Sequence, residues 1–86
     1  MQPETPATLV ATVAKNAAEE VRVSLSEFKG SQLIDLRIYA EFGAAVGEKQ
    51  ATRKGIALKL AKLPELIEAL QAARIKAERM GLLTAA

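Results

Sequence analysis

The chain has 86 residues and a net charge of +2, and half of its residues are apolar. A chain of this length forms one domain with room for two packed layers. It has no His and no Cys, so it lacks the usual proton shuttle, the thiolate nucleophile and the common zinc and haem ligands. We therefore expect no enzyme, no metal site and no cofactor.

Signals for membranes and secretion are weak. The apolar runs are only a few residues long, and the N-terminus has no basic segment that leads into an apolar one. This pattern argues against a membrane span and against a signal peptide. We expect a cytoplasmic protein with no membrane partner.

The charge is distributed unevenly. Residues 1–20 carry one basic and three acidic side chains, a net −2, whereas residues 21–60 carry seven basic and four acidic ones, a net +3. The middle of the chain is therefore the part that would attract a polyanion.

Residues 1–20 are expected to form an N-terminal tail that is partly disordered, and residues 21–86 the folded domain. The first eight residues contain two of the three prolines, and they offer little apolar surface to offset the cost of ordering. From Leu9 to Val13 the β-branched content rises, but the alanines nearby suit a helix equally well. An extended edge segment and disorder both remain open here.

Alternating apolar and polar residues then predict strands. Gly30 can supply a turn between the first two, because glycine adopts positive φ at little cost. Twelve residues from Ser31 to Phe42 would span about 40 Å as a strand, so curvature or a bulge is expected. We expect antiparallel strands over 21–26, 31–42, 48–54 (a polar strand or arm) and 56–60, with a loop over 43–47.

A helix follows. Pro64 suits the first turn of a helix, and Gly81 suits a left-handed cap at its end. Between them an apolar stripe recurs at steps of three and four residues over about seventeen residues. The expected fold is α+β: a curved four-stranded antiparallel sheet with the C-terminal helix packed on one face. The sheet residues expected against the helix are Ile34, Leu36, Ile38, Ile56 and Leu58.

The opposite face of this sheet is basic and partly aromatic. Arg22, Arg37, Tyr39 and Lys59 alternate out of the helix-facing set, and Asp35, among apolar neighbours, is expected to hold an arginine or a backbone amide. Two of the three aromatic residues lie beside cations. Such a face is a platform for single-stranded nucleic acid, because cations follow phosphates while aromatic rings stack on bases.

Three segments in order resemble the transcriptional coactivator family called positive cofactor four. They are Val21 to Gly30, which ends in Phe-Lys-Gly, then Leu33 to Tyr39, and then Thr52 to Leu58, which contains Arg-Lys-Gly-Ile. The helix opening at Pro64 is similar too. The resemblance covers roughly residues 20–80. It implies a homodimer whose two curved sheets form a groove for single-stranded DNA.

The resemblance also implies roles for individual residues. Phe28 would stack on bases, and Lys29, Arg53 and Lys54 would meet phosphates. The chain departs from the family where Ser31 replaces a basic residue, and where Ala40 replaces a tryptophan of the eukaryotic form. The expected nucleic-acid-binding residues are Phe28, Lys29, Ser31, Arg37, Tyr39, Lys49, Arg53, Lys54 and Gly55.

The expected function is that of a homodimeric single-stranded DNA-binding protein with little sequence preference. It would act at the nucleoid as a transcription cofactor or as an accessory in repair or replication. One alternative is a dimeric protein-interaction module that docks on the transcription machinery, because Ile75, Leu82 and Leu83 lie off the helix stripe or beyond its end. Binding of single-stranded RNA is a second alternative, since stacking and phosphate contacts do not select the sugar.

Overall fold

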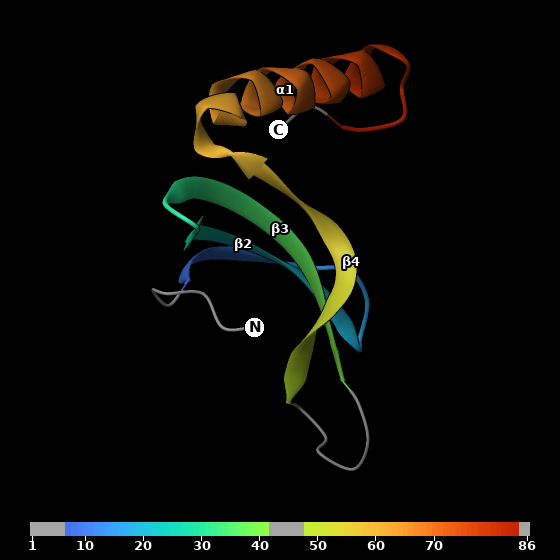
Figure 1. Ribbon diagram of the computed structural model, residues 1–86. Coiled ribbons are helices and arrows are strands. Elements are labelled where there is room, and N and C mark those ends of the chain that lie inside the picture. The colour runs from blue at the N-terminus through green and yellow to red at the C-terminus, as the bar shows by residue number, and fades with distance from the viewer. Residues whose placement is uncertain (1–6, 42–47, 85–86) are drawn as a thin grey trace.

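The structure is a computed structural model that describes residues 7–41 and 48–84. Four strands are followed by a short 3-10 helix and one long helix (Figure 1). The loop expected over 43–47 and the first six residues of the expected tail lie outside the described residues. The elements are β1 (Thr8–Ala14), β2 (Glu19–Phe28), β3 (Ser31–Glu41), β4 (Lys49–Lys59), η1 (Leu60–Lys62) and α1 (Leu63–Arg79).

The four strands form one antiparallel sheet in the order β1-β2-β3-β4, so each strand pairs with its neighbour in sequence. The β2–β3 hairpin closes with Phe28 paired to Ser31. Its two turn residues both have positive φ, 52° at Lys29 and 81° at Gly30, as a two-residue hairpin turn of the primed type requires. The turn predicted at Gly30 is confirmed.

β1 decides between the two alternatives left open for residues 9–13, in favour of an extended edge segment. Residues 8–14 form an edge strand on β2, in register from Thr8 opposite Leu25 to Ala14 opposite Glu20. All seven residues are exposed. The following turn is closed by Asn16, whose side-chain oxygen accepts hydrogen bonds from the backbone N–H groups of Ala18 and Glu19, both at 2.9 Å. The sheet therefore begins well before residue 21.

β4 is a single strand, whereas two strands were expected over 48–54 and 56–60. The strand continues through Gly55, which joins the two expected segments. The backbone has a φ of 149° there, a conformation that glycine adopts and other residues rarely do. The register with β3 shifts between Arg37 and Tyr39, which is the irregularity expected for a strand of this length. The count of four strands holds because β1 supplies the fourth.

The helix prediction is confirmed at both ends. α1 has 17 residues and carries Pro64 in its first turn. At its end Gly81 has a φ of 75°. The N–H of Gly81 donates to the carbonyl of Glu78, and that of Leu82 donates to the carbonyl of Ala77 at 2.9 Å. This pair of bonds is the Schellman cap that a glycine after the last turn favours.

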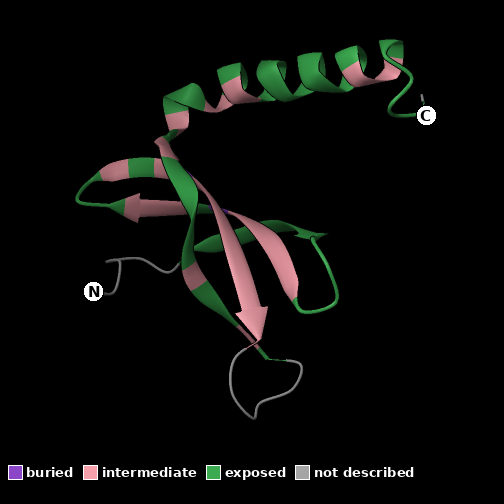
Figure 2. Cartoon of the chain, turned by 90° about the vertical axis from the view of Figure 1, so that its right-hand side faces the viewer, coloured by how far each residue is buried: buried purple, intermediate pink, exposed green. Residues whose placement is uncertain are grey.

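The packing of the helix differs from the expectation. α1 lies over one face of the sheet, but none of its residues is buried (Figures 1 and 2). Between the helix and the sheet is an open apolar groove of about 370 Å³. It is lined by Val10, Val23, Leu25, Ile34 and Leu36 of the sheet and by Leu63, Leu66, Ile67 and Leu70 at the start of the helix.

A single copy therefore has almost no closed core. Ile34, at 3 % exposure, is the one buried apolar residue in the described part of the chain, whereas Ile56 is 49 % and Leu70 is 59 % exposed. Among the described residues, no helix combines the length and the apolar character that a membrane crossing requires.

The strand crossing at Gly55 predicts a specific loss of stability. A Cβ at this position would lie 2.3 Å from the carbonyl oxygen of Leu36, and its φ disfavours any other residue. We expect Gly55→Ala to lower the free energy of unfolding by about 2–4 kcal/mol, measured by chemical denaturation at fixed protein concentration. Gly30→Ala is the control, because no atom lies within 4 Å of its Cβ and backbone strain alone costs about 1–2 kcal/mol. An equal loss in the two variants would contradict the close approach.

Candidate nucleic-acid interface

The strand register separates the sheet into two faces. Val23, Leu25, Ile34 and Leu36 lie on the face that lines the groove under the helix. The other face, here called the charged face, carries residues two apart along each strand, as a pleated strand requires. The pairs Glu20–Tyr39, Arg22–Arg37, Phe28–Ser31 and Glu41–Lys49 lie directly opposite one another on neighbouring strands. Its polar and aromatic members are Glu20, Arg22, Ser24, Ser26, Phe28, Ser31, Asp35, Arg37, Tyr39, Glu41, Lys49 and Lys59, with Lys59 opposite the apolar Leu33 as the register places it.

One end of the charged face is the β2–β3 hairpin. Phe28 is 46 % exposed, and the Lys29 ammonium lies 5.3 Å from the centre of its ring. Among the described residues, Lys29 has no carboxylate partner. An exposed ring beside an unpaired cation offers one surface for stacking and one for a phosphate.

The middle of the charged face is occupied by Arg37. Its guanidinium donates to Asp35 Oδ1 at 2.8 Å and to the backbone oxygen of Arg53 at 3.1 Å. Asp35 was predicted to hold either an arginine or a backbone amide, and the structure confirms the arginine. Arg37 thereby joins β3 to β4, and part of its charge is already matched.

Tyr39 lies at the far end of the charged face. Eight residues separate it from Ser31, which is about 27 Å along an extended strand. The guanidinium of Arg22 lies 4.1 Å from the centre of its ring, a cation–π contact. Lys49 is close by, with its ammonium 3.8 Å from Glu20 and 3.9 Å from Glu41.

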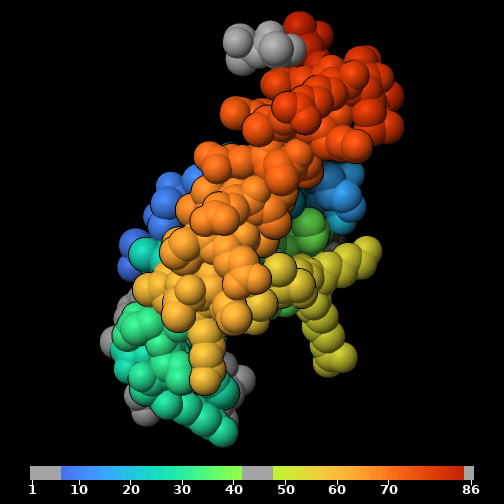
Figure 3. Space-filling model, turned by 90° about the horizontal axis from the view of Figure 1, so that it is seen from above, coloured from blue at the N-terminus to red at the C-terminus, as the bar shows by residue number. Residues whose placement is uncertain are grey.

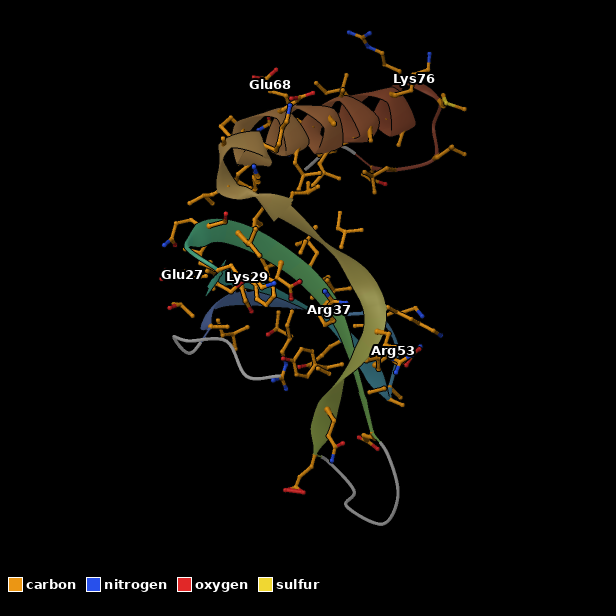
Figure 4. All side chains as sticks on the ribbon, viewed as in Figure 1. Glu27, Lys29, Arg37, Arg53, Glu68 and Lys76 are labelled. Carbon is orange, nitrogen blue, oxygen red and sulfur yellow. The ribbon has the colours of Figure 1, made fainter. Side chains whose placement is uncertain are left out.

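Arg53 and Lys54 lie on the outer part of β4. Figure 4 shows Arg37 inside the curve of β4 and Arg53 on its outer side, and Figure 3 shows long yellow side chains of β4 that project clear of the molecule. Both residues are exposed, and neither forms an ion pair with a carboxylate within the described ranges, although hydrogen bonds and, more weakly, the charge of Lys54 lower the pKa of Glu19. Gly55 contributes the close approach of β4 to β3 described above. One copy thus divides the expected residues between the charged face and the outer edge of β4.

A comparison with protein families identifies the chain. The family model for the transcriptional coactivator p15 (PC4) matches residues 15–69, which is more than half of the chain and includes β2, β3, β4 and the start of α1. The chain belongs to the PC4 family. The resemblance stated from the sequence is therefore confirmed.

Solved structures of a PC4 homologue agree in fold. The chain is similar to BPSL1147, a PC4 homolog from Burkholderia pseudomallei K96243, in two crystal forms. For the tetragonal form the identity is 26 % and the TM-score 0.70, over 79 % of this chain and 97 % of that chain. For the orthorhombic form they are 25 % and 0.71, over 84 % and 95 %. No curated protein matches the chain significantly.

The PC4 match spans all nine expected binding residues. Sequence reasoning placed Arg22 on the basic face but not among the binding residues, and it gave no role to Glu20 and Glu41. A spacing signal was available for part of this set. Glu20 and Arg22, like Asp35 and Arg37, are two residues apart, so each pair of opposite charges shares one face of a strand. The contact between Glu20 and Lys49 has no such signal, because it joins β2 to β4 across β3.

Proposed function

We propose that this chain acts as a homodimer that binds single-stranded DNA with little sequence preference. It would serve transcription, or repair and replication, at the nucleoid. The observation that carries the proposal is an exposed phenylalanine beside an unpaired lysine at the edge of a charged sheet, in a member of the PC4 family. No chemistry is needed for this role, and binding rests on stacking and phosphate contacts.

The unpaired cations support the phosphate-binding part of the proposal. Lys29, Arg53 and Lys54 form no ion pair with a carboxylate among the described residues, although hydrogen bonds and, more weakly, the charge of Lys54 lower the pKa of Glu19. Their charges are therefore available to a polyanion. Phe28 offers 46 % of its surface to solvent, enough to accept a base. Stacking and charge contacts of this kind tolerate any base, since every base has a π-face and every nucleotide a phosphate.

The apolar groove supports the dimer. The helix offers exposed apolar side chains above it, with Ile67 at 45 % and Leu70 at 59 %. The residues expected to need a second chain are exposed as well, Ile75 at 42 %, Leu82 at 72 % and Leu83 at 48 %. A second copy seated on this side would bury them and would bring two sets of basic residues into one particle.

A titration with a labelled oligothymidylate tests the binding. We expect the logarithm of the association constant to fall with log salt at a slope near −3, if about four phosphates are neutralised. Phe28→Ala should weaken binding by about 1–3 kcal/mol through lost stacking, and Lys54→Gln should reduce the slope by about 0.7. Lys76→Gln on the helix is the matched control, because it removes the same charge away from the sheet (Figure 4).

Two results of this titration would contradict single-stranded DNA binding. One is equal affinity for duplex and single strand, and the other is no loss when Phe28→Ala and Lys54→Gln are combined. A tight dimer without nucleic-acid affinity would favour the protein-interaction module instead. Tighter binding of the matching RNA oligonucleotide would assign the role to RNA.

A charge placed in the groove tests the dimer. Leu70→Lys should convert the protein to a monomer in light scattering, because an ammonium cannot be buried there without a partner. Ala72→Lys is the control, since two residues further on the helix the side chain points away from the groove. Circular dichroism checks that each variant keeps its sheet and helix. Dimers of equal stability in both variants would rule out this groove as the interface.

A further inference from the structure

A network of five side chains closes the Tyr39 end of the charged face. Glu20 Oε2 accepts from Arg22 Nε at 2.6 Å, and Glu20 Oε1 lies 3.8 Å from Lys49 Nζ. Lys49 also lies 3.9 Å from Glu41, and Arg22 covers the Tyr39 ring at 4.1 Å. We call these five residues, from β2, β3 and β4, the Glu20 network.

Glu20 is the residue that joins this network. It forms ion pairs to two different basic residues, Arg22 and Lys49. Its side chain is 18 % exposed and that of Lys49 is 19 % exposed, less than the other ion-paired side chains of the described residues. Both cations are thus held close to the sheet by one anionic group.

The hairpin end of the charged face has no such arrangement. Lys29 meets an aromatic ring and no described carboxylate. The two ends therefore differ in how available their cations are to a polyanion. Lys29 at the hairpin has no ion pair with a described carboxylate, whereas Arg22 and Lys49 beside Tyr39 are already paired with Glu20.

We propose that Glu20 occupies the position of a nucleic-acid phosphate, and that a bound strand must displace it from Arg22 and Lys49. This inference rests on the proposed function. A carboxylate and a phosphate present the same kind of anionic oxygen to a guanidinium. Ion pairs that solvent reaches contribute little to stability, so a phosphate can compete for both cations. Glu20 sets the affinity of this end, and Arg22 joins the binding residues.

Displacement also changes the environment of Tyr39. Arg22 now covers one face of its ring, and when the guanidinium turns to a phosphate that face becomes available to a base. Tyr39 is the single tyrosine, and the chain has no tryptophan. Its intrinsic fluorescence therefore reports on this end of the charged face alone.

The test compares Glu20→Gln with the wild type in a titration with a labelled oligothymidylate long enough to cover both ends. We expect Glu20→Gln to bind about three- to tenfold more tightly at low salt, since the amide cannot compete as an anion. The gain should shrink as salt rises, because screening weakens the competition. The tyrosine emission should change on binding in both proteins.

Two further variants separate this role from a change in net charge. Glu68→Gln removes the same charge from the exposed face of the helix (Figure 4), and it should change the affinity less than twofold, because an exposed charge far from the sheet is screened. Adding Arg22→Gln to Glu20→Gln should abolish most of the gain. Glu41→Gln, which frees Lys49 from one partner only, should give a smaller gain and serves if Glu20→Gln unfolds.

The outcomes are distinct. Binding by the wild type with no greater gain in Glu20→Gln than in Glu68→Gln would overturn the role of Glu20 and leave the proposed function intact. No binding by either the wild type or Glu20→Gln would overturn both. Binding by Glu20→Gln alone would support both, with Glu20 as the stronger competitor.

Discussion

The structure depends on an apolar surface that one copy of the chain cannot close. The helix connects to the sheet through η1 and lies over it without burying any of its own residues, and Ile34 is the one buried apolar residue of the described chain. Burial of apolar area is the main favourable contribution to folding, so a domain of this size with an open groove lacks much of its stabilisation. In the proposed dimer, a second copy would supply the missing surface from the same side chains.

The same constraint determines which side of the sheet is free for a ligand. If the apolar face under the helix is covered by a second copy, as we propose, the charged face is left to meet nucleic acid. Its basic residues are not uniformly available. The hairpin end presents Phe28 with an unpaired Lys29, and the Tyr39 end holds its cations in ion pairs with Glu20 and Glu41. A bound strand would therefore meet a cation without a described carboxylate partner at the hairpin end and ion-paired cations at the Tyr39 end.

Local patterns in the sequence predicted the local structure. Period-two alternation predicted β2 and β3, Gly30 the hairpin turn, and Pro64 and Gly81 the two ends of α1, because each of these depends on residues close in sequence. β1 could not be separated from disorder, since its threonines and valines alternate with alanines and its order depends on pairing with β2. The continuity of β4 through Gly55 depends on a contact with the backbone of Leu36.

In the candidate site, too, the features that depend on residues close in sequence were predicted, and those that depend on long-range contacts were not. The residues and the face were predicted from alternation and family resemblance. An arginine was one of the two partners predicted for Asp35, and the structure shows that it is Arg37. The contact of Glu20 with Lys49 joins strands that are not neighbours, and the open groove under the helix depends on how residues far apart in the sequence pack. Neither has a signature in the spacing of residues along one chain.

The mass of the protein in solution, measured by sedimentation equilibrium over a wide range of protein concentration, tests the central claim most directly. The account predicts a folded species with twice the 9.2 kDa mass of the chain, and loss of secondary structure wherever dilution separates the copies. A species with the mass of one chain that keeps its full sheet and helix signal on dilution would contradict it.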